Sequence, residues 1–190
     1  MEKIRVLLVE DDEYWKNNIS DDLGKEDDIS LAGVVSTKED ALSALQSIEV
    51  DIILMDINLT ANNLDGIEIA RELKRTGGSS SKIIMLTSLH QKEIVMQSFK
   101  QGAVNFITKS SYQDIIRAIR EAYYNRSAIH PDAAEMLRTE IILSDLTPME
   151  REIYDLKQQG YNKTQISELL YKSVNTIKSQ LRSIRDKLRG

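Results

Sequence analysis

Short apolar runs rich in β-branched residues recur along the first two thirds of the chain. Continuous runs of this kind predict strands that are buried on both faces, and the segments between them carry apolar residues at helical spacing. Strand–helix units in succession predict a parallel, doubly wound sheet of five strands with helices on both faces. The expected strands cover residues 4–10, 29–36, 51–57, 82–88 and 105–110, and the expected helices cover residues 12–23, 38–48, 65–76, 92–102 and 112–125.

Polar side chains stand where four of these strands end. Parallel strands end at one edge of a sheet, so we expect these side chains to converge there. The third strand ends on Asp56, whose buried carboxylate requires a compensating cation. Polar strand ends are common by themselves, but several carboxylates facing a lysine favour a Mg²⁺ site. The converging residues are Glu10, Asp11 and Asp12 after the first strand, Asp56 after the third, Thr87 and Ser88 after the fourth, and Lys109 and Ser110 after the fifth.

A different pattern of apolar positions begins near Leu146. Thr147, Pro148 and Glu150 have the spacing of a capping box that starts a helix, and Asn162 is a candidate cap for the next helix. Short helices joined by a tight turn, the last of them basic, predict a helix-turn-helix, and a small helical protein-docking domain is the alternative. The expected helices cover residues 146–160, 162–170 and 175–190. The buried stripe of the last helix is expected to consist of Ile177, Leu181, Ile184 and Leu188.

Charge separates the two patterns. The net charge is −5, but 14 basic and 21 acidic residues precede Asn125, whereas 9 basic and 6 acidic residues follow Ser144. An acidic front and a basic tail predict domains with different partners, over residues 1–124 and 145–190. We interpret residues 125–144 as a linker with a helical turn that starts at Pro131, and we expect His130 to be exposed there and not to bind a ligand.

Composition excludes several classes of protein. The chain has no cysteine, which excludes disulfides and thiolate metal sites, and its two scattered histidines argue against a histidine-rich metal site. The sequence has no apolar stretch long enough to span a membrane and does not begin with a signal-peptide pattern. A cytoplasmic location without a membrane partner is the expectation.

The polar strand ends carry a resemblance to a known family. Residues 1–124 resemble the receiver domain of bacterial response regulators, which has an acidic pair, a phosphorylated aspartate, a Ser/Thr and a lysine at these strand ends. The resemblance implies a flavodoxin-like fold and Mg²⁺ as cofactor. It implies that Asp56 is the phosphoacceptor, that Thr87 and Lys109 assist it, that Thr87 and Phe106 form the switch, and that the metal ligands are Glu10, Asp11, Asp56 and the backbone carbonyl of Asn58.

The receiver-like part departs from the family pattern near its site. The family has a proline shortly after the phosphorylated aspartate, where this chain has Thr60 or Ala61, and the loop is about two residues longer. Ser110 stands where a proline usually follows the lysine. Apolar Leu89 occupies a position that tunes dephosphorylation in the family, so we expect a long-lived phosphoryl group.

The tail is similar to the LuxR-type output domain of NarL/FixJ response regulators. The matched residues are Leu146, Thr147, Glu150, Gly160, Ile166, Ser173, Thr176, Ile177, Lys178, Lys187 and Leu188. Met149, Ser167 and Gln180 depart from common residues of that family. A fourth helix, which often serves dimerisation, is not present before Gly190. The expected DNA contacts are Thr176, Lys178, Ser179, Gln180, Arg182, Ser183 and Arg185.

Together these features predict a transcription regulator of a two-component system. A sensor histidine kinase or a small phosphodonor would phosphorylate Asp56, and the chain would pair through its receiver to bind double-stranded DNA. Its only catalysis would be its own phosphoryl transfer and dephosphorylation. One alternative is a Mg²⁺-dependent phosphohydrolase, but those enzymes have a second aspartate where this chain has Asn58. Another is a regulator that works without phosphorylation.

Overall fold

The computed structural model describes residues 2–60, 64–76, 80–88, 91–126 and 129–189. It divides into two compact units, Met1–Met136 and Leu137–Gly190. Part of the loop after Asp56 lies outside the described residues. Leu89, on which the expectation of a long-lived phosphoryl group rests, also lies outside them. None of the described helices is long and apolar enough to cross a membrane.

The first unit is built on the five-stranded parallel sheet that the sequence predicts. The strands run in the order β2-β1-β3-β4-β5, so β2 and β5 are its edges. The buried core is made mainly of aliphatic side chains from β1, β3, β4 and β5. The strands are β1 (Ile4–Val9), β2 (Ile29–Val35), β3 (Ile52–Asp56), β4 (Lys82–Thr87) and β5 (Ala103–Thr108).

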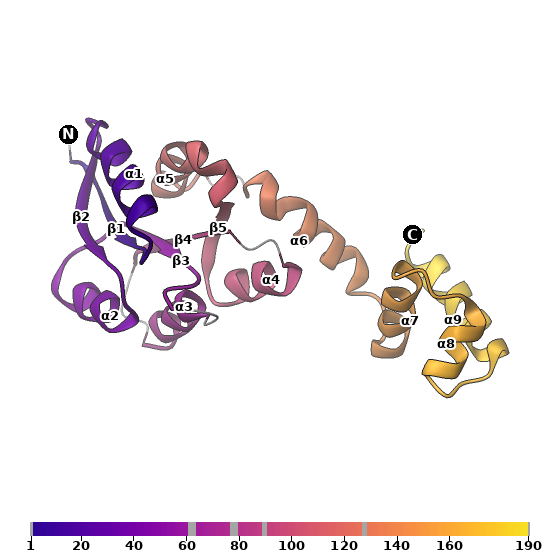
Figure 1. Ribbon diagram of the computed structural model, residues 1–190. Coiled ribbons are helices and arrows are strands. Elements are labelled where there is room, and N and C mark those ends of the chain that lie inside the picture. Colours follow the sequence, from indigo (N-terminus) through magenta and orange to yellow (C-terminus); the bar gives the residue numbers. More distant parts are fainter. Residues whose placement is uncertain (1, 61–63, 77–79, 89–90, 127–128, 190) are drawn as a thin grey trace. The chain divides into compact units, whose positions relative to one another are not determined.

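Helices cover both faces of this sheet, which confirms the predicted doubly wound architecture. In Figure 1, α1 and α5 lie over one face, and α2, α3 and α4 lie over the other. Because the central strands β1, β3 and β4 are buried between these helices, the polar strand ends are the places where side chains leave the core. The helices are α1 (Glu13–Gly24), α2 (Lys38–Ser47), α3 (Asp65–Thr76), α4 (Lys92–Lys100) and α5 (Ile115–Tyr123).

The chain after β5 differs from the expectation in three ways. Strand β5 ends at Thr108 and a 3₁₀ helix, η1 (Lys109–Asp114), precedes α5. The expected turn at Pro131 is the start of a longer helix, α6 (Pro131–Leu143). The expectation that His130 is exposed is wrong, because its side chain is 7% exposed. His130, directly before α6, lies against the edge strand β5, where its N–H donates to Asn105 Oδ1 at 2.9 Å.

The second unit contains the predicted helices around one apolar cluster. Thr147 and Glu150 form the expected capping box, and Asn162 caps the next helix through the N–H groups of Thr164 and Gln165. The helices are α7 (Pro148–Gln158), α8 (Lys163–Leu169) and α9 (Val174–Lys187). The predicted stripe of α9 is confirmed: Ile177 and Ile184 are buried, and Leu181 and Leu188 pack partly buried against the same cluster.

Candidate functional site

Three strand ends bring their charged side chains together at one edge of the sheet. Lys109, which follows β5, places its Nζ 2.8 Å from Asp56 Oδ2 and 2.9 Å from Glu10 Oε1. Glu10 is fully buried, and Asp56 and Lys109 are 5% and 6% exposed. Asp11 is exposed beside them, whereas Asp12 caps α1 by accepting the N–H groups of Tyr14 and Trp15. The predicted convergence is therefore present for Glu10, Asp11, Asp56 and Lys109, whereas Asp12 has a structural role.

The buried charges in this cluster are not balanced, because two carboxylates share one ammonium. Burial, together with repulsion from Asp56, raises the pKa of Glu10 to about 7, although Lys109 opposes the shift. Burial disfavours the charged form of Lys109, but its hydrogen bonds with Asp56 and Glu10 outweigh burial and raise its pKa. The site thus holds an excess of negative charge that another cation would relieve.

The donor set fits a hard divalent cation. One carboxylate oxygen each from Glu10, Asp11 and Asp56 lies within 4.8 Å of the others. Oε2 of Glu10 is buried with no hydrogen-bond partner among the described residues; the Lys109 ammonium is 2.7 Å away, but directs its hydrogen bond to Oε1. Carboxylate oxygens of this kind are the ligands that Mg²⁺ prefers. Asn58, the fourth expected ligand residue, donates its N–H to Asp56 Oδ1 at 3.3 Å.

The expected switch residues are placed on the neighbouring strands. Asp56 pairs with Leu86 in the sheet, so Thr87 lies one residue further along β4, where it is 1% exposed. Phe106 on β5 is fully buried and pairs with Met85. Thr87 therefore stands beside the acidic cluster, and Phe106 lies behind it in the core.

Gly66 was not anticipated as part of the site. It lies in the first turn of α3, and its N–H donates to the carbonyl of Ile57 at 3.0 Å. A Cβ added at Gly66 would lie 2.2 Å from the carbonyl oxygen of Asp56. Only glycine permits this approach of α3 to the strand end, and the Asp-Gly pair in the sequence was the available signal.

Trp15, in the first turn of α1, lies against the site lysine. Its ring centroid lies 5.6 Å from Lys109 Nζ, within the range of a cation–π interaction. Tyr14 and Tyr112 meet the Trp15 ring edge-on, with centroids 5.3 and 5.6 Å away. Trp15 and Lys109 are far apart in the sequence, so their contact depends on the tertiary fold.

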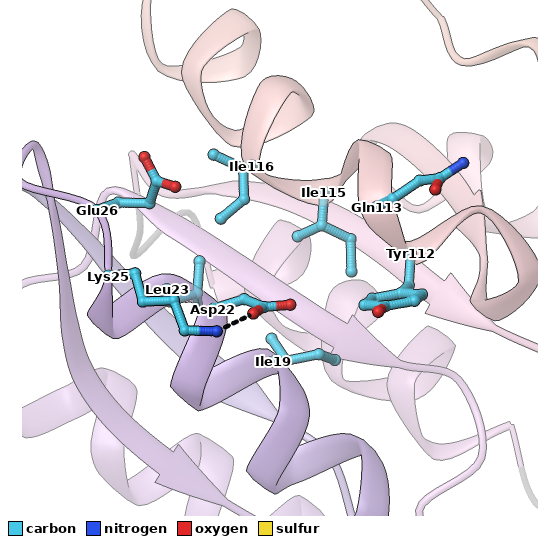
Figure 2. A pocket seen from close by; sticks show the side chains of 9 residues that line it. All are labelled: Ile19, Asp22, Leu23, Lys25, Glu26, Tyr112, Gln113, Ile115 and Ile116. Atoms are coloured by element: carbon cyan, nitrogen blue, oxygen red, sulfur yellow. Dashed lines mark hydrogen bonds and ion pairs between the residues drawn. The ribbon is translucent and has the colours of Figure 1, made fainter.

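A separate groove of about 220 Å³ lies between α1 and the η1–α5 segment (Figure 2). Figure 2 shows aliphatic side chains and the Tyr112 ring facing one another, with Lys25 paired to Asp22 at the rim. None of the site acids lines it. Its lining residues are Ile19, Asp22, Leu23, Lys25, Glu26, Tyr112, Gln113, Ile115 and Ile116.

In the second unit, most of the expected DNA contacts lie on the outer surface of α9. Thr176, Lys178, Ser179, Arg182 and Arg185 are exposed, and Gln180 is partly exposed. Ser183 differs, because its hydroxyl donates to Glu150 Oε1 at 2.6 Å.

Glu150 has a second role that the capping pattern did not reveal. Besides capping α7, it accepts hydrogen bonds from Ser183 and from Lys187 Nζ at 2.7 Å. These bonds from Lys187 and Ser183, with that from the Thr147 N–H, lower the pKa of Glu150 to about 2. Glu150 therefore joins α7 to α9, and Lys187 is committed to that contact.

Comparison with known proteins settles the family. The model of the response regulator receiver domain matches residues 6–120. The chain belongs to the response regulators. The curated relatives of this response regulator include the response regulator protein VraR of Staphylococcus epidermidis, which is 30% identical over 97% of this chain and 90% of the relative. VraR of Staphylococcus aureus is 28% identical over the same shares.

Solved response regulators share the fold of this response regulator. RcsB of Salmonella typhimurium, at 22% identity, has a TM-score of 0.69 over 99% of this chain and 93% of that one. An RcsB–DNA complex, at 21% identity, has a TM-score of 0.70 over 98% and 92%. These matches extend over both units, so the receiver fold followed by a helical output unit is the architecture of the chain.

Proposed function

We propose that this response regulator is a transcription factor that is switched by phosphorylation of Asp56 and binds DNA through α9. The observation that carries the proposal is the cluster of Glu10, Asp56 and Lys109, with Lys109 Nζ within 3 Å of both acids. Such a cluster serves an aspartate that accepts a phosphoryl group, because Lys109 is a fixed cation beside the aspartate and the remaining carboxylates can hold a metal ion as a second cation.

In the proposed reaction, an Asp56 carboxylate oxygen attacks the phosphorus of the donor. A phosphorus–oxygen bond to Asp56 forms while the bond from phosphorus to the leaving group breaks, and the donor departs with the bonding electrons. Mg²⁺ held by Glu10, Asp11, Asp56 and the Asn58 carbonyl would neutralise charge on the transferring phosphoryl group. Lys109 would exchange part of its contact with the acids for a phosphoryl oxygen. A sensor histidine kinase or a small phosphodonor would supply the group.

The product would change the surroundings of Asp56. A phosphoryl group carries a charge of about −2 and strong acceptor oxygens. We infer that the Thr87 hydroxyl moves to donate to one of them, and that Phe106 rearranges behind it. This is a local change in charge that biases a two-state element. We further infer that the receiver unit then pairs with a second copy, as expected for a chain that binds two DNA half-sites.

The outer surface of α9 supports the DNA-binding part of the proposal. Lys178, Arg182 and Arg185 would contact phosphates, and Thr176, Ser179 and Gln180 lie on the same helix within reach of base edges. Ser183 is a weaker candidate because its hydroxyl is bound to Glu150. The RcsB structures include one described as two RcsB dimers bound to two parallel DNAs, which supports an analogous role here.

To test phosphorylation, the chain is incubated with acetyl phosphate and Mg²⁺, and the product is detected by its intact mass. One phosphoryl group should appear on the wild-type chain and on Asp27→Asn, whose carboxylate is exposed. None should appear on Asp56→Asn. Undiminished labelling of Asp56→Asn would overturn the assignment of the phosphoacceptor.

DNA binding is tested with a mixed-sequence duplex at several salt concentrations. Replacing Lys178, Arg182 and Arg185 by alanine should weaken binding at low salt and reduce the slope of log affinity against log salt by about one per lost contact. The exposed cation Lys3 of the other unit serves as the control. An unchanged slope in the triple variant would exclude α9 as the DNA-contacting helix. Sedimentation of the full chain before and after phosphorylation tests pairing.

A further inference from the structure

Strand β5 ends at Thr108, directly before the site lysine, and it is an edge strand of the sheet. An edge strand has one row of backbone N–H groups without a neighbouring strand. The start of α6 supplies a partner for one N–H group of this row. Oδ2 of Asp132 accepts the Thr108 N–H at 2.9 Å and the Thr108 hydroxyl at 2.7 Å. Asp132 thus anchors the residue that directly precedes Lys109.

The anchor extends into the turn that carries Lys109. The Thr108 and Ser110 hydroxyl oxygens lie 2.7 Å apart, and the Ser111 hydroxyl donates to Asp132 Oδ1 at 3.4 Å. Thr108 is 1% exposed, so these bonds are largely shielded from water. Burial opposes ionisation of Asp132, but its bonds with Thr108 outweigh burial and lower the pKa of this carboxyl. The carboxylate is therefore held as an acceptor for the turn.

His130 holds the anchoring segment in place. Its backbone N–H and that of Phe106 both donate to Asn105 Oδ1 at 2.9 Å. Its Nδ1 lies 3.3 Å from the Asp132 N–H and its Nε2 lies 3.2 Å from Asp114 Oδ2. The imidazole thus lies between two carboxylates, because its Nδ1 is also 3.3 Å from Asp132 Oδ2. The start of α6 is therefore tied to β5 and to the end of η1.

The sequence gives a reason why such an anchor is needed. Ser110 occupies the position where a proline ring would fix φ of the residue after Lys109. Serine leaves that dihedral free, and a shift of about 1 Å in a charged group can cost up to 100-fold in rate. The bonds that Asp132 makes with Thr108 and Ser111 restrain the same stretch of backbone from outside the strand.

We propose that Asp132 is a positioning residue for Lys109, which it holds between Glu10 and Asp56 by fixing the end of β5. The inference rests on the proposed phosphorylation of Asp56 and adds to it a residue from the start of α6. Among the described residues, the hydrogen bonds that Asp132 accepts come from Thr108 and Ser111, so it acts on Lys109 through Thr108. The same bonds connect the phosphoryl pocket to the helix in which the first unit ends.

The test uses the full chain and compares Asp132→Ala with Asp132→Asn and with Glu135→Ala, an exposed acid one turn further along α6. The initial rate of Asp56 phosphorylation by acetyl phosphate should fall about tenfold in Asp132→Ala. Glu135→Ala should match the wild type. Because one oxygen of Asp132 accepts both Thr108 bonds, Asp132→Asn should retain most of the rate.

A double-mutant cycle separates positioning from general destabilisation. In a Lys109→Ala background, Asp132→Ala should cause no further loss of rate. An equal loss in both backgrounds would overturn the proposal, as would a wild-type rate in Asp132→Ala. Asp132→Asn provides the same comparison if the alanine variant does not fold.

A spectroscopic measurement tests the position of Lys109 without any phosphorylation. Trp15 is the only tryptophan, and the Lys109 ammonium lies 5.6 Å from its ring centroid. Displacing this cation should shift the Trp15 emission in Asp132→Ala but not in Glu135→Ala. An unshifted emission would contradict the proposed role of Asp132. Failure of the wild-type chain to become phosphorylated would instead overturn the proposed function.

Discussion

Each unit buries one glutamate beside a lysine, and the two glutamates have opposite pKa shifts. Glu10 in the first unit is fully buried, and its pKa is raised to about 7. Glu150 in the second unit is 3% exposed, and its pKa is lowered to about 2. Burial alone would raise both values, so the difference lies in what surrounds each carboxylate.

The partners of the two carboxylates explain the difference. Glu150 accepts hydrogen bonds from Lys187, Ser183 and the Thr147 N–H, so both of its oxygens are used. Glu10 shares its lysine with Asp56 and keeps one buried oxygen without a hydrogen bond among the described residues. A satisfied buried carboxylate stabilises the fold, whereas an unsatisfied pair of carboxylates is ready for a cation. The comparison distinguishes a structural acid from a binding-site acid by geometry alone.

The largest expected effect follows from removing the shared lysine. Lys109→Ala should slow phosphorylation of Asp56 by acetyl phosphate about 100-fold, because the transferring group loses a fixed positive charge. Lys187→Ala, which removes the lysine of the structural acid, should leave that rate unchanged. Initial rates measured by intact mass provide the check. A Lys109→Ala rate within about twofold of wild type would contradict the role of this lysine.

The same substitution at the two glutamates should have opposite effects on stability. Glu10→Gln should stabilise the first unit in the absence of Mg²⁺, by on the order of 2 kcal/mol at pH 8, because it removes a charge that the folded state disfavours. Glu150→Gln should destabilise the second unit, because it loses the ion pair with Lys187. Trp15 fluorescence follows unfolding of the first unit, and hydrogen exchange of peptides from α7 and α9 follows the second. If both substitutions changed the free energy of unfolding in the same direction, the distinction between the two sites would be wrong.

The two units should also respond differently to pH. The pKa of Glu10 is higher in the folded chain than its ordinary value of 4.5, so its contribution to stability is present below pH 4.5 and is lost as pH rises through 7. Without Mg²⁺, the first unit should become less stable across this range, and Mg²⁺ should restore part of the loss. Denaturant titrations followed by Trp15 fluorescence test this. A Glu10→Gln control should lack this component of the pH dependence.

The smallest expected effect is on the stability of the second unit at low pH. The pKa of Glu150 is lowered from 4.5 to about 2, so the stability that it contributes is present above pH 4.5 and is lost as pH falls towards 2. Glu150→Ala should lower the midpoint of thermal unfolding of this unit by roughly 5 °C at pH 7 and by less at pH 3. Thermal unfolding followed by circular dichroism at the two pH values measures this midpoint. An equal drop at both would show that the ion pair with Lys187 contributes little.

The sequence by itself determined the order of elements and the residues at the strand ends. Apolar runs and helical spacing were sufficient for the parallel sheet, the capped helices of the second unit and the buried stripe of α9. These features depend on residues close together in the chain, where periodicity and capping act directly. The convergence of Glu10, Asp56 and Lys109 was also predictable, because parallel strands must end at the same edge.

Only the tertiary structure decided how the remaining side chains are used. His130 was expected to be an exposed linker residue, Glu150 was expected only to cap a helix, and the sequence did not single out Asp132. In the structure, His130 is bound to Asn105 and Asp114, and Glu150 is bound to Ser183 and Lys187. Asp132 is bound to Thr108. None of these contacts leaves a periodic signal in the sequence. A hydrogen bond between distant segments forms only if the donor–acceptor distance is right to within a few tenths of an ångström. Such distances are set by the packing of whole elements, and no local pattern in the chain encodes them.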